Sequence, residues 1–296
     1  MFRIDDPTAA TSLPTPEAAG TEGYFTEGNP TAGTPATNVR GSWLNMIQEE
    51  LRAIVVAAGL TPSKTAYNQV LLALTGRYLG SQVFTSSGTY TPGVYNGVTA
   101  KKGRFRGVAA GGGSGGCIAT SSGQVAGSGA GSAGNPFDFW VISGLASMAI
   151  TVGAAGAAGP AGANNGGAGG DLIIGAIATI KGGRGGGAGN ATATFPSLFN
   201  PSFANANSTI ASAGGMVLAG IINGLGQTGV RGIALSTGSL LYAAGGNSAW
   251  GTGGTVDSAN GGGYGSGGGG NGIGQSTAAS PGFAGSGGIL VIDEFA

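Results

Sequence analysis

Glycine is the feature that most constrains this chain. Residues 81–296 contain 58 glycines, whereas residues 1–80 contain 8. Glycine buries no side chain and loses more backbone entropy on folding than any other residue, so such a region tends toward disorder. Yet 41% of the residues are hydrophobic, too many for a disordered low-complexity chain. We therefore expect dense backbone hydrogen bonding and burial between copies of the chain, which predicts an oligomer.

The remaining composition excludes several kinds of function. The chain has 12 basic and 12 acidic residues, no histidine, and one cysteine, Cys117. So balanced and sparse a charge gives no electrostatic footprint for nucleic acid. One cysteine without histidine excludes a Cys/His zinc site, an internal disulfide and histidine-dependent catalysis. The composition predicts a protein that binds or builds and that needs no metal or cofactor.

Two stretches bear on location. Residues 1–7 lack a basic region followed by an apolar run, so we expect no signal peptide. The stretch 139–170 carries no charge, but it is rich in glycine, and its most apolar part, 139–152, is too short to cross a bilayer as a helix. We expect a protein made in a cytoplasm without export and not embedded in a membrane.

The glycine content changes near residue 80, which predicts a domain boundary there, and the first region divides again near residue 40. Residues 1–40 are rich in Pro, Thr, Ala and Gly, which predicts an extended arm that orders against another surface, with Tyr24 and Phe25 as anchors. A floppy tail is the alternative.

A helical hairpin is expected over residues 41–80. In the first helix, hydrophobic residues recur at helical spacing from Trp43 to Ala58, with Ser42 as N-cap and Gly59 as stop. A second helix should follow the turn at 61–62, capped by Ser63 or Thr65 and extending to Tyr78. Because two amphipathic helices cannot bury both apolar stripes alone, we expect symmetry mates to cover them. The predicted interface residues are Leu44, Ile47, Leu51, Ile54, Tyr67, Leu71 and Leu74.

Residues 81–296 have the pattern of an all-β domain. Short β-prone runs alternate with glycine runs. Strands are predicted at 82–91, 104–108, 137–142, 148–152, 172–175, 178–181, 216–218, 221–222 and 289–295. The fold class is therefore α+β and mostly β: an extended arm at 1–40, helices at 41–80 and a glycine-rich β domain at 81–296.

The glycine runs admit several readings. Gly111, Gly113 and Gly116 match the dinucleotide-binding fingerprint, but that fingerprint requires a helix to begin at its third glycine, and residues 117–123 are unfavourable for a helix N-terminus. Glycines at 153, 156, 159 and 162 keep a period of three, too briefly for a collagen triple helix. The same period belongs to polyglycine II, an extended helix that hydrogen-bonds to parallel neighbours. The runs form either such helices or flexible loops, and the sequence leaves both open.

Candidate binding residues are aromatic and amide side chains in loop-like contexts. Such side chains are the usual tools for holding sugars or protein surfaces. The candidates are Asn247, Trp250, Tyr264 and Asn271, whereas Trp140 is expected to lie in a buried strand. Glycoside hydrolysis needs two carboxylates flanking a bond, and the region has carboxylates at 138, 171, 257, 293 and 294. Counting them does not exclude such a pair, but no cluster suggests a groove, so an enzyme is not predicted.

Several segments carry a family resemblance. Segments 11–16 (TSLPTP), 20–30 (GTEGYFTEGNP), 33–37 (GTPAT), 43–51 (WLNMIQEEL) and 59–64 (GLTPSK) resemble the N-terminal region of tail fibre proteins of tailed bacteriophages and prophages. Segments 84–90 (FTSSGTY), 150–153 (ITVG) and 287–295 (GGILVIDEF) are similar to glycine-rich distal domains of phage fibres and adhesins. At 296 residues the chain leaves no room for a long shaft, which indicates a short fibre.

The resemblance implies a homotrimer that attaches to the tail or baseplate and binds a host-surface receptor (a polysaccharide, a pilus or an outer-membrane protein). It implies a location in the virion, after synthesis in the host cytoplasm and release by lysis. Tyr24, Phe25 and Trp43 are then the expected tail-docking residues. Such a protein adheres and does not catalyse; a purely structural connector and a depolymerising tailspike are the alternatives.

Overall fold

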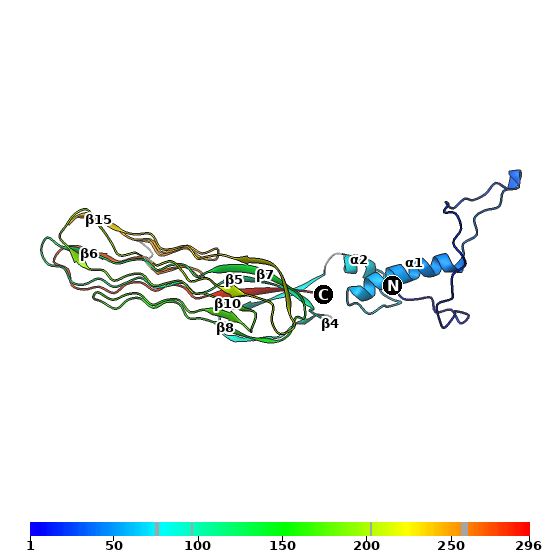
Figure 1. The fold of residues 1–296 in the computed structure, drawn as a ribbon, viewed down its shortest axis with the longest axis horizontal. Helices are drawn as coiled ribbons and strands as arrows, with labels where there is room; N and C mark the ends of the chain where they lie inside the picture. Colours follow the sequence, from blue (N-terminus) through cyan, green and yellow to red (C-terminus); the bar gives the residue numbers. More distant parts are fainter. Residues whose placement is uncertain (75–76, 96, 202, 256–259) are drawn as a thin grey trace. The chain divides into compact units, whose positions relative to one another are not determined.

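The computed structural model describes residues 1–74, 77–95, 97–201, 203–255 and 260–296, without the side chain of Leu74. The chain divides into two compact units (Figure 1): unit 1 is Met1–Tyr78 with Ala296, and unit 2 is Leu79–Phe295. Within the described ranges, no helix combines the length and apolar character that crossing a membrane requires. The fold is mostly β, as the sequence predicts.

Unit 1 joins the arm to two α-helices. The arm has one short 3-10 helix, η1 (Pro30–Ala32), and is otherwise irregular and almost wholly exposed. The side chain of Asn29 accepts from two backbone N–H groups and caps η1, while Gly33 takes a left-handed φ of 69° that turns the chain back. Helix α1 (Gly41–Ala57) follows the predicted apolar stripe, and α2 (Gln69–Leu74) is short.

Two details of the expected helical hairpin are wrong. Arg40 occupies the N-cap of α1 without a capping side chain, and the predicted cap, Ser42, lies inside the helix, where its hydroxyl donates to Glu17. Helix α2 begins only at Gln69. The buried amide of Gln69 accepts from Ser63 N–H and donates to Thr61 C=O, so these two backbone groups of the preceding segment bond to a side chain and not within a helix. Tyr67 therefore lies before α2, and Tyr78 begins a strand.

Unit 2 contains two five-stranded sheets at one end. The first sheet has the order β1 (Tyr78–Phe84), β18 (Ile289–Phe295), β5 (Lys102–Val108), β7 (Pro136–Ser143), β14 (Val217–Asn223). The second has the order β13 (Thr209–Ile210), β10 (Ala178–Ile180), β9 (Leu172–Ile174), β8 (Met148–Val152), β2 (Gly88–Tyr90). The last strand of the chain thus lies inside its sheet, between strands from the start of the unit.

Smaller sheets complete the unit. They are β11 (Ala191–Thr192) with β6 (Val125–Gly127) and β17 (Gly272–Ile273); β12 (Ser197–Leu198) with β15 (Ile233–Ser236) and β16 (Ser239–Leu241); and β3 (Val94–Tyr95) with β4 (Val98–Thr99). The single strand predicted at 82–91 is two strands, since residues 85–87 separate β1 from β2. The two strands predicted at 216–222 are one, β14, which stays paired with β7 across two register shifts.

The core lies between the two large sheets. Phe137, Phe139 and Val141 alternate inward along β7, while Trp140 is half-buried on the outer face, so the predicted strand is confirmed but the tryptophan is not in the core. The rings of Phe105 and Phe139 stack with centroids 5.3 Å apart. Every second residue of a strand faces the same side, which brings one face of each sheet into a shared apolar layer.

The glycine runs extend away from this core as helices of the polyglycine II type. Along the central segment 110–117, successive N–H groups donate to three neighbouring segments in rotation, and the direction repeats every third residue. The pairs are Gly111 to Ser286, Gly112 to Ser132, Gly113 to Gly167, Ser114 to Phe283, Gly115 to Gly129 and Gly116 to Asn164. Three residues per turn is the period of this helix class.

The carbonyl groups of the central segment accept from three further segments. Gly156, Gly159 and Gly162 donate to it at successive turns, so three of the four period-three glycines of the sequence face this segment, whereas Gly153 lies against Gly170. Residues 183–189 and Gly268 supply the other donors. One segment is therefore bonded to six neighbours. The hydrogen bonds decide between the two readings that the sequence left open: these runs are packed helices.

Close approach explains the glycine requirement. None of the glycines at 111–116 has a positive φ, so backbone conformation does not demand them. A Cβ added at Gly113 would instead collide with the backbone carbonyl of Ala157. Helices that pack backbone to backbone leave no space for a side chain on a face that meets a neighbour.

Candidate functional site

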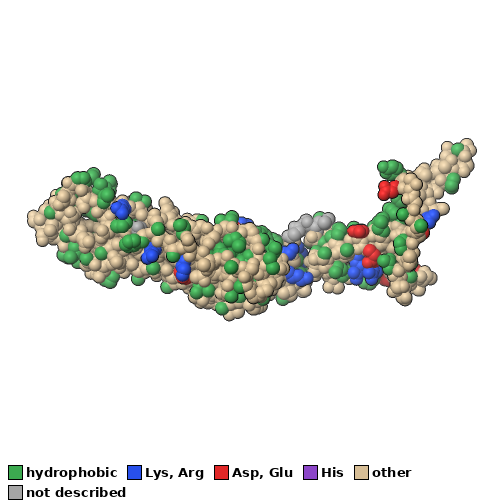
Figure 2. Space-filling view, in the orientation of Figure 1, with side chains coloured by type: hydrophobic (Ala, Val, Ile, Leu, Met, Phe, Trp, Pro, Cys, Tyr) green, Lys and Arg blue, Asp and Glu red, His purple; other side chains and the backbone are tan. Residues whose placement is uncertain are grey.

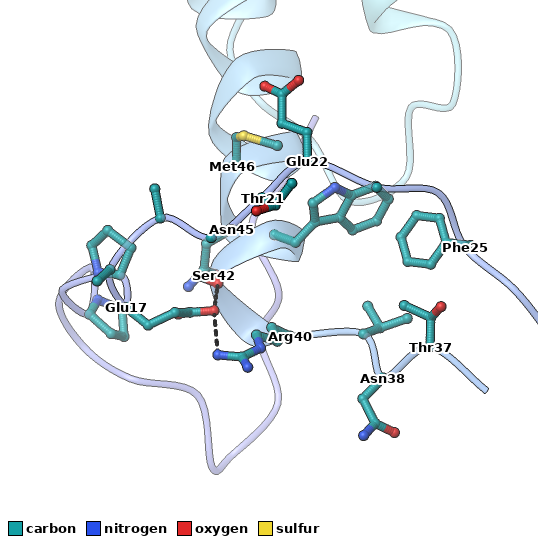
Figure 3. Close-up of a pocket in the computed structure, with 18 of the residues that line it drawn as sticks. Glu17, Thr21, Glu22, Phe25, Thr37, Asn38, Arg40, Ser42, Asn45 and Met46 are labelled. Carbon is teal, nitrogen blue, oxygen red and sulfur yellow. Dashed lines mark hydrogen bonds and ion pairs between the residues drawn. The ribbon is translucent and has the colours of Figure 1, made fainter. Parts of the chain in front are cut away.

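Two surfaces of the protein have features of binding sites, one in each unit. In unit 2, β6 and β15 lie at the end opposite the large sheets (Figure 1). We call this end, with its two three-stranded sheets, the loop end. In unit 1, the arm and α1 enclose a groove of about 940 Å³ (Figure 3).

An exposed aliphatic row crosses the sheet of β12, β15 and β16. Leu198 lies opposite Ile233, and Ile233 lies opposite Leu241, so the three side chains share one face. Leu198 and Leu241 are 62% and 59% exposed, and Leu235, which follows at a bulge, is 50% exposed. We call these four residues the loop-end patch, and Figure 2 shows hydrophobic side chains gathered at this end.

The opposite face of the same sheet is covered. Ala234 is buried against Val125 and Phe199, and Leu240 packs on the same cluster. The covered face fixes the orientation of the sheet, so the row of Leu198, Ile233 and Leu241 must point outward. No sequence prediction named these residues. The turn at 237–238 between two short apolar runs is the hairpin signal that could have located them.

The structure brings three of the four predicted receptor residues near one another and places Asn271 elsewhere. Trp250 and Tyr264 form an isolated bridge, with Tyr264 N–H donating to Trp250 C=O at 3.1 Å, and Asn247 accepts from nearby Gly253 N–H. Trp250 packs on Val108, Ile289 and Val291, at the outer face of the first sheet, 5.9 Å above the guanidinium of Arg106. These contacts give Trp250 a packing role at the sheet end.

Asn271 lies elsewhere, next to β17. Its amide donates to the hydroxyl of Ser280 at 2.8 Å and to Pro281 C=O at 2.7 Å, and its backbone N–H donates to Ser128. The side chain thus links glycine-rich segments to one another. Its hydrogen-bonding groups serve the fold.

The predicted tail-docking residues lie together at the groove of unit 1. Thr26 and Thr37 hydrogen-bond across the turn of the arm, which returns the chain toward α1. The ring of Phe25 meets the edge of Trp43 with centroids 4.9 Å apart, while Tyr24 is 99% exposed. Arg40 and Ser42 both donate to Glu17 at the groove (Figure 3).

The predicted oligomer interface is uncovered in one chain. Leu44, Tyr67 and Leu71 are exposed, and Ile47, Leu51 and Ile54 are partly buried. The side chain of Leu74 lies outside the described residues. An apolar stripe in this state is available to a second copy.

Each described carboxylate of unit 2 has a structural partner. Asp138 binds Arg104, Asp171 binds Lys181 at 2.7 Å, and Asp293 lies 3.1 Å from Arg106. Asp257 lies outside the described residues. Within the described ranges, no three His, Cys, Asp or Glu side chains gather as metal ligands do. Burial raises the pKa of the Cys117 thiol to about 11, which keeps it protonated at neutral pH.

Glu294 is fully buried but well satisfied. Its carboxylate accepts from the hydroxyls of Tyr90 and Tyr95 at 2.7 and 2.6 Å, from Gly93 N–H at 2.8 Å and from the amide of Gln82 at 3.2 Å. Burial acts to raise the pKa of this group, but the donors outweigh it, and the pKa lies below its ordinary value. The arrangement stabilises a charge and leaves none of it free for a substrate.

Comparisons with known proteins give a limited match. No protein-family model matches the chain. It is similar to "Uncharacterized protein StfP" of Escherichia coli (strain K12), with 43% identity over 74 residues. The match covers 25% of this chain and 34% of the relative, so the chain spans about a third of that protein's length.

Proposed function

We propose that this chain is a short tail fibre of a tailed bacteriophage or prophage, which attaches to the tail through unit 1 and binds a host-surface receptor through unit 2. The name of the relative, StfP, suggests a side tail fibre protein, and the motifs of residues 11–64 support the same family. The proposal includes a homotrimer, residence in the virion after release by lysis, and adhesion without catalysis.

The loop-end patch is the observation that carries the receptor-binding part of this proposal. Leu198, Ile233, Leu235 and Leu241 form an exposed or partly exposed apolar surface at the end of the unit away from its side-chain core. Contiguous exposed apolar surface marks interaction sites on soluble proteins. Weak contacts at each tip become avid when several tips engage one cell, which suits adhesion.

A cell-binding assay tests the patch. The double variant Leu198→Ser and Leu241→Ser of the full chain should bind host cells at least about tenfold more weakly. Full burial of one leucine side chain contributes about 1.5–3 kcal/mol of binding free energy. Val94→Ser, a change at a 66% exposed residue of β3 outside the patch, is the matched control. Equal binding by both variants would contradict the role of the patch.

The packed polyglycine II helices of unit 2 favour a second function, that of a structural connector. A unit in which one segment is bonded to six neighbours is a rigid spacer in itself. This alternative predicts that the unaltered chain binds no host cells, with or without surface polysaccharide or pili. Binding that disappears with the polysaccharide, with the pili or with neither separates the receptor classes, and no binding supports the connector.

A further inference from the structure

We propose that the groove of unit 1 receives a polypeptide segment of the tail that inserts a bulky apolar side chain and places a lysine or arginine beside Glu22. This inference rests on the proposed function, because it names the chemistry of the tail partner. It follows from the charge of the arm, from the groove's apolar floor and from Glu22, a lining carboxylate to which no described residue donates.

The arm is acidic along its whole length between two arginines. From Arg3 to Arg40 the chain has carboxylates at 5, 6, 17, 22 and 27 and no intervening Lys or Arg. Three of these carboxylates are engaged within unit 1: Asp5 by Lys64, Asp6 by Thr8 and Glu17 by Arg40. Among the described residues, none donates to Glu22 or Glu27.

The two free carboxylates differ in position. Glu22 lines the groove, whereas Glu27 does not. In Figure 3 the carboxylate of Glu22 points away from Arg40, whose guanidinium is turned toward Glu17. Glu22 thus gives the groove a carboxylate to which no described residue donates, and Glu27 gives the same charge on the same arm outside the groove.

The floor of the groove is apolar and aromatic. Phe25, Trp43 and Met46 line it and are 57%, 39% and 54% exposed. The edge-to-face pair of Phe25 and Trp43 leaves aromatic surface open to a side chain. An apolar floor with a free carboxylate beside it matches a segment that carries a bulky apolar residue near a basic one, since opposite charges at an interface rim set partner choice.

Reattachment to particles tests the charge. Particles produced from a genome with this coding sequence deleted are mixed with the purified full chain, and bound protein is measured at rising NaCl. Glu22→Lys should lower attachment by about tenfold at low salt, and less at high salt because salt screens exposed charges. Glu27→Lys is the matched control and should attach like the unaltered chain.

A second pair of variants tests the floor. Met46→Ser should also weaken attachment, without a change in its salt dependence. Val56→Ser alters a residue of α1 that is 47% exposed and outside the groove, and it should attach normally. If Glu22→Lys attaches like Glu27→Lys, and Met46→Ser attaches like Val56→Ser, the groove is not the docking site and the inference is overturned.

Two other outcomes have distinct meanings. If Glu22→Lys changes the oligomeric mass in light scattering while attachment is unchanged, the occupant is a second copy of this chain, and the inference is overturned in favour of that copy. If the unaltered chain neither occurs in particles nor reattaches to them, the proposed function itself fails. If the unaltered chain attaches normally and the two lysine variants change attachment equally, the inference is overturned but the proposed function stands.

Discussion

Gly285 and Gly287 lie two residues apart in one glycine segment but have different surroundings. A Cβ at Gly285 would collide with the backbone of Gly111 in the central segment, whereas a Cβ at Gly287 would meet nothing within 4 Å. Neither residue has a positive φ. The spacing between helices therefore requires glycine at one position and tolerates a side chain at the other.

Alanine substitutions separate these two positions. Gly285→Ala should destabilise unit 2 by about 1–3 kcal/mol, the usual effect of overpacking, because a backbone neighbour cannot rotate away. Gly287→Ala should be neutral or stabilise by about 0.4–1 kcal/mol through the unfolded state. Urea unfolding of the full chain gives both values, and equal effects would contradict the packed-helix interpretation.

At the scale of elements, Glu294 joins strands that are far apart in sequence. It lies on β18 of the first sheet and accepts from Tyr90 on β2 of the second sheet, from Tyr95 on β3 and from the turn at Gly93. The carboxylate thus connects both large sheets with the loop between β2 and β3. The strand pattern of residues 289–295 predicts β18 itself, but not these partners.

Glu294→Gln should destabilise the chain by about 1–3 kcal/mol at neutral pH, because a neutral amide cannot accept from four donors as the carboxylate does. The pKa of Glu294 is lowered in the folded chain, so its contribution is present above the unfolded value near 4.5 and is lost as pH falls through the folded pKa. The difference between variant and unaltered chain, measured by urea unfolding, should therefore shrink below about pH 4.5. Glu50→Gln, at an exposed residue of α1, should show no such difference.

At the scale of the whole molecule, the apolar stripe of α1 is the basis of the proposed association between copies. The stripe residues stay exposed or partly buried in one chain: Leu44, Ile47, Leu51 and Ile54. Helix α2, with its six residues, is too short to cover them. Burial between copies would remove this apolar surface from water and stabilise the assembly. It would also offset part of the entropy that the glycine-rich unit loses on folding.

We expect the full chain to have three chain masses in light scattering, and Leu51→Asp to reduce it to one, because a charge on the stripe is costly to bury. Ala53→Asp places the same charge on an exposed position of α1 outside the predicted interface and should leave the trimer intact. A monomeric unaltered chain would rule out the trimer.

Local patterns in the sequence determined the type of most elements. The helical stripe after Ser42 predicted α1, and alternating residues predicted the strands at 137–142, 148–152 and 289–295, because helix and strand periods are set by near neighbours in the chain. Period-three glycines at 156, 159 and 162 were visible in the same way. What these glycines contact was not.

Only the tertiary structure decided which segments meet. Glycine has no side chain, so the sequence pattern of a glycine run does not predict which segment it packs against. The six neighbours of residues 110–117 are therefore known only from the tertiary structure. The same holds for Trp250, which is partly buried through its contacts with β5 and β18, and for Leu198, Ile233 and Leu241, which share a face only through their register. The sequence by itself determined the kind of most helices and strands, because their periods are local; long-range backbone pairing determined the packing of the polyglycine II helices and the exposed surfaces.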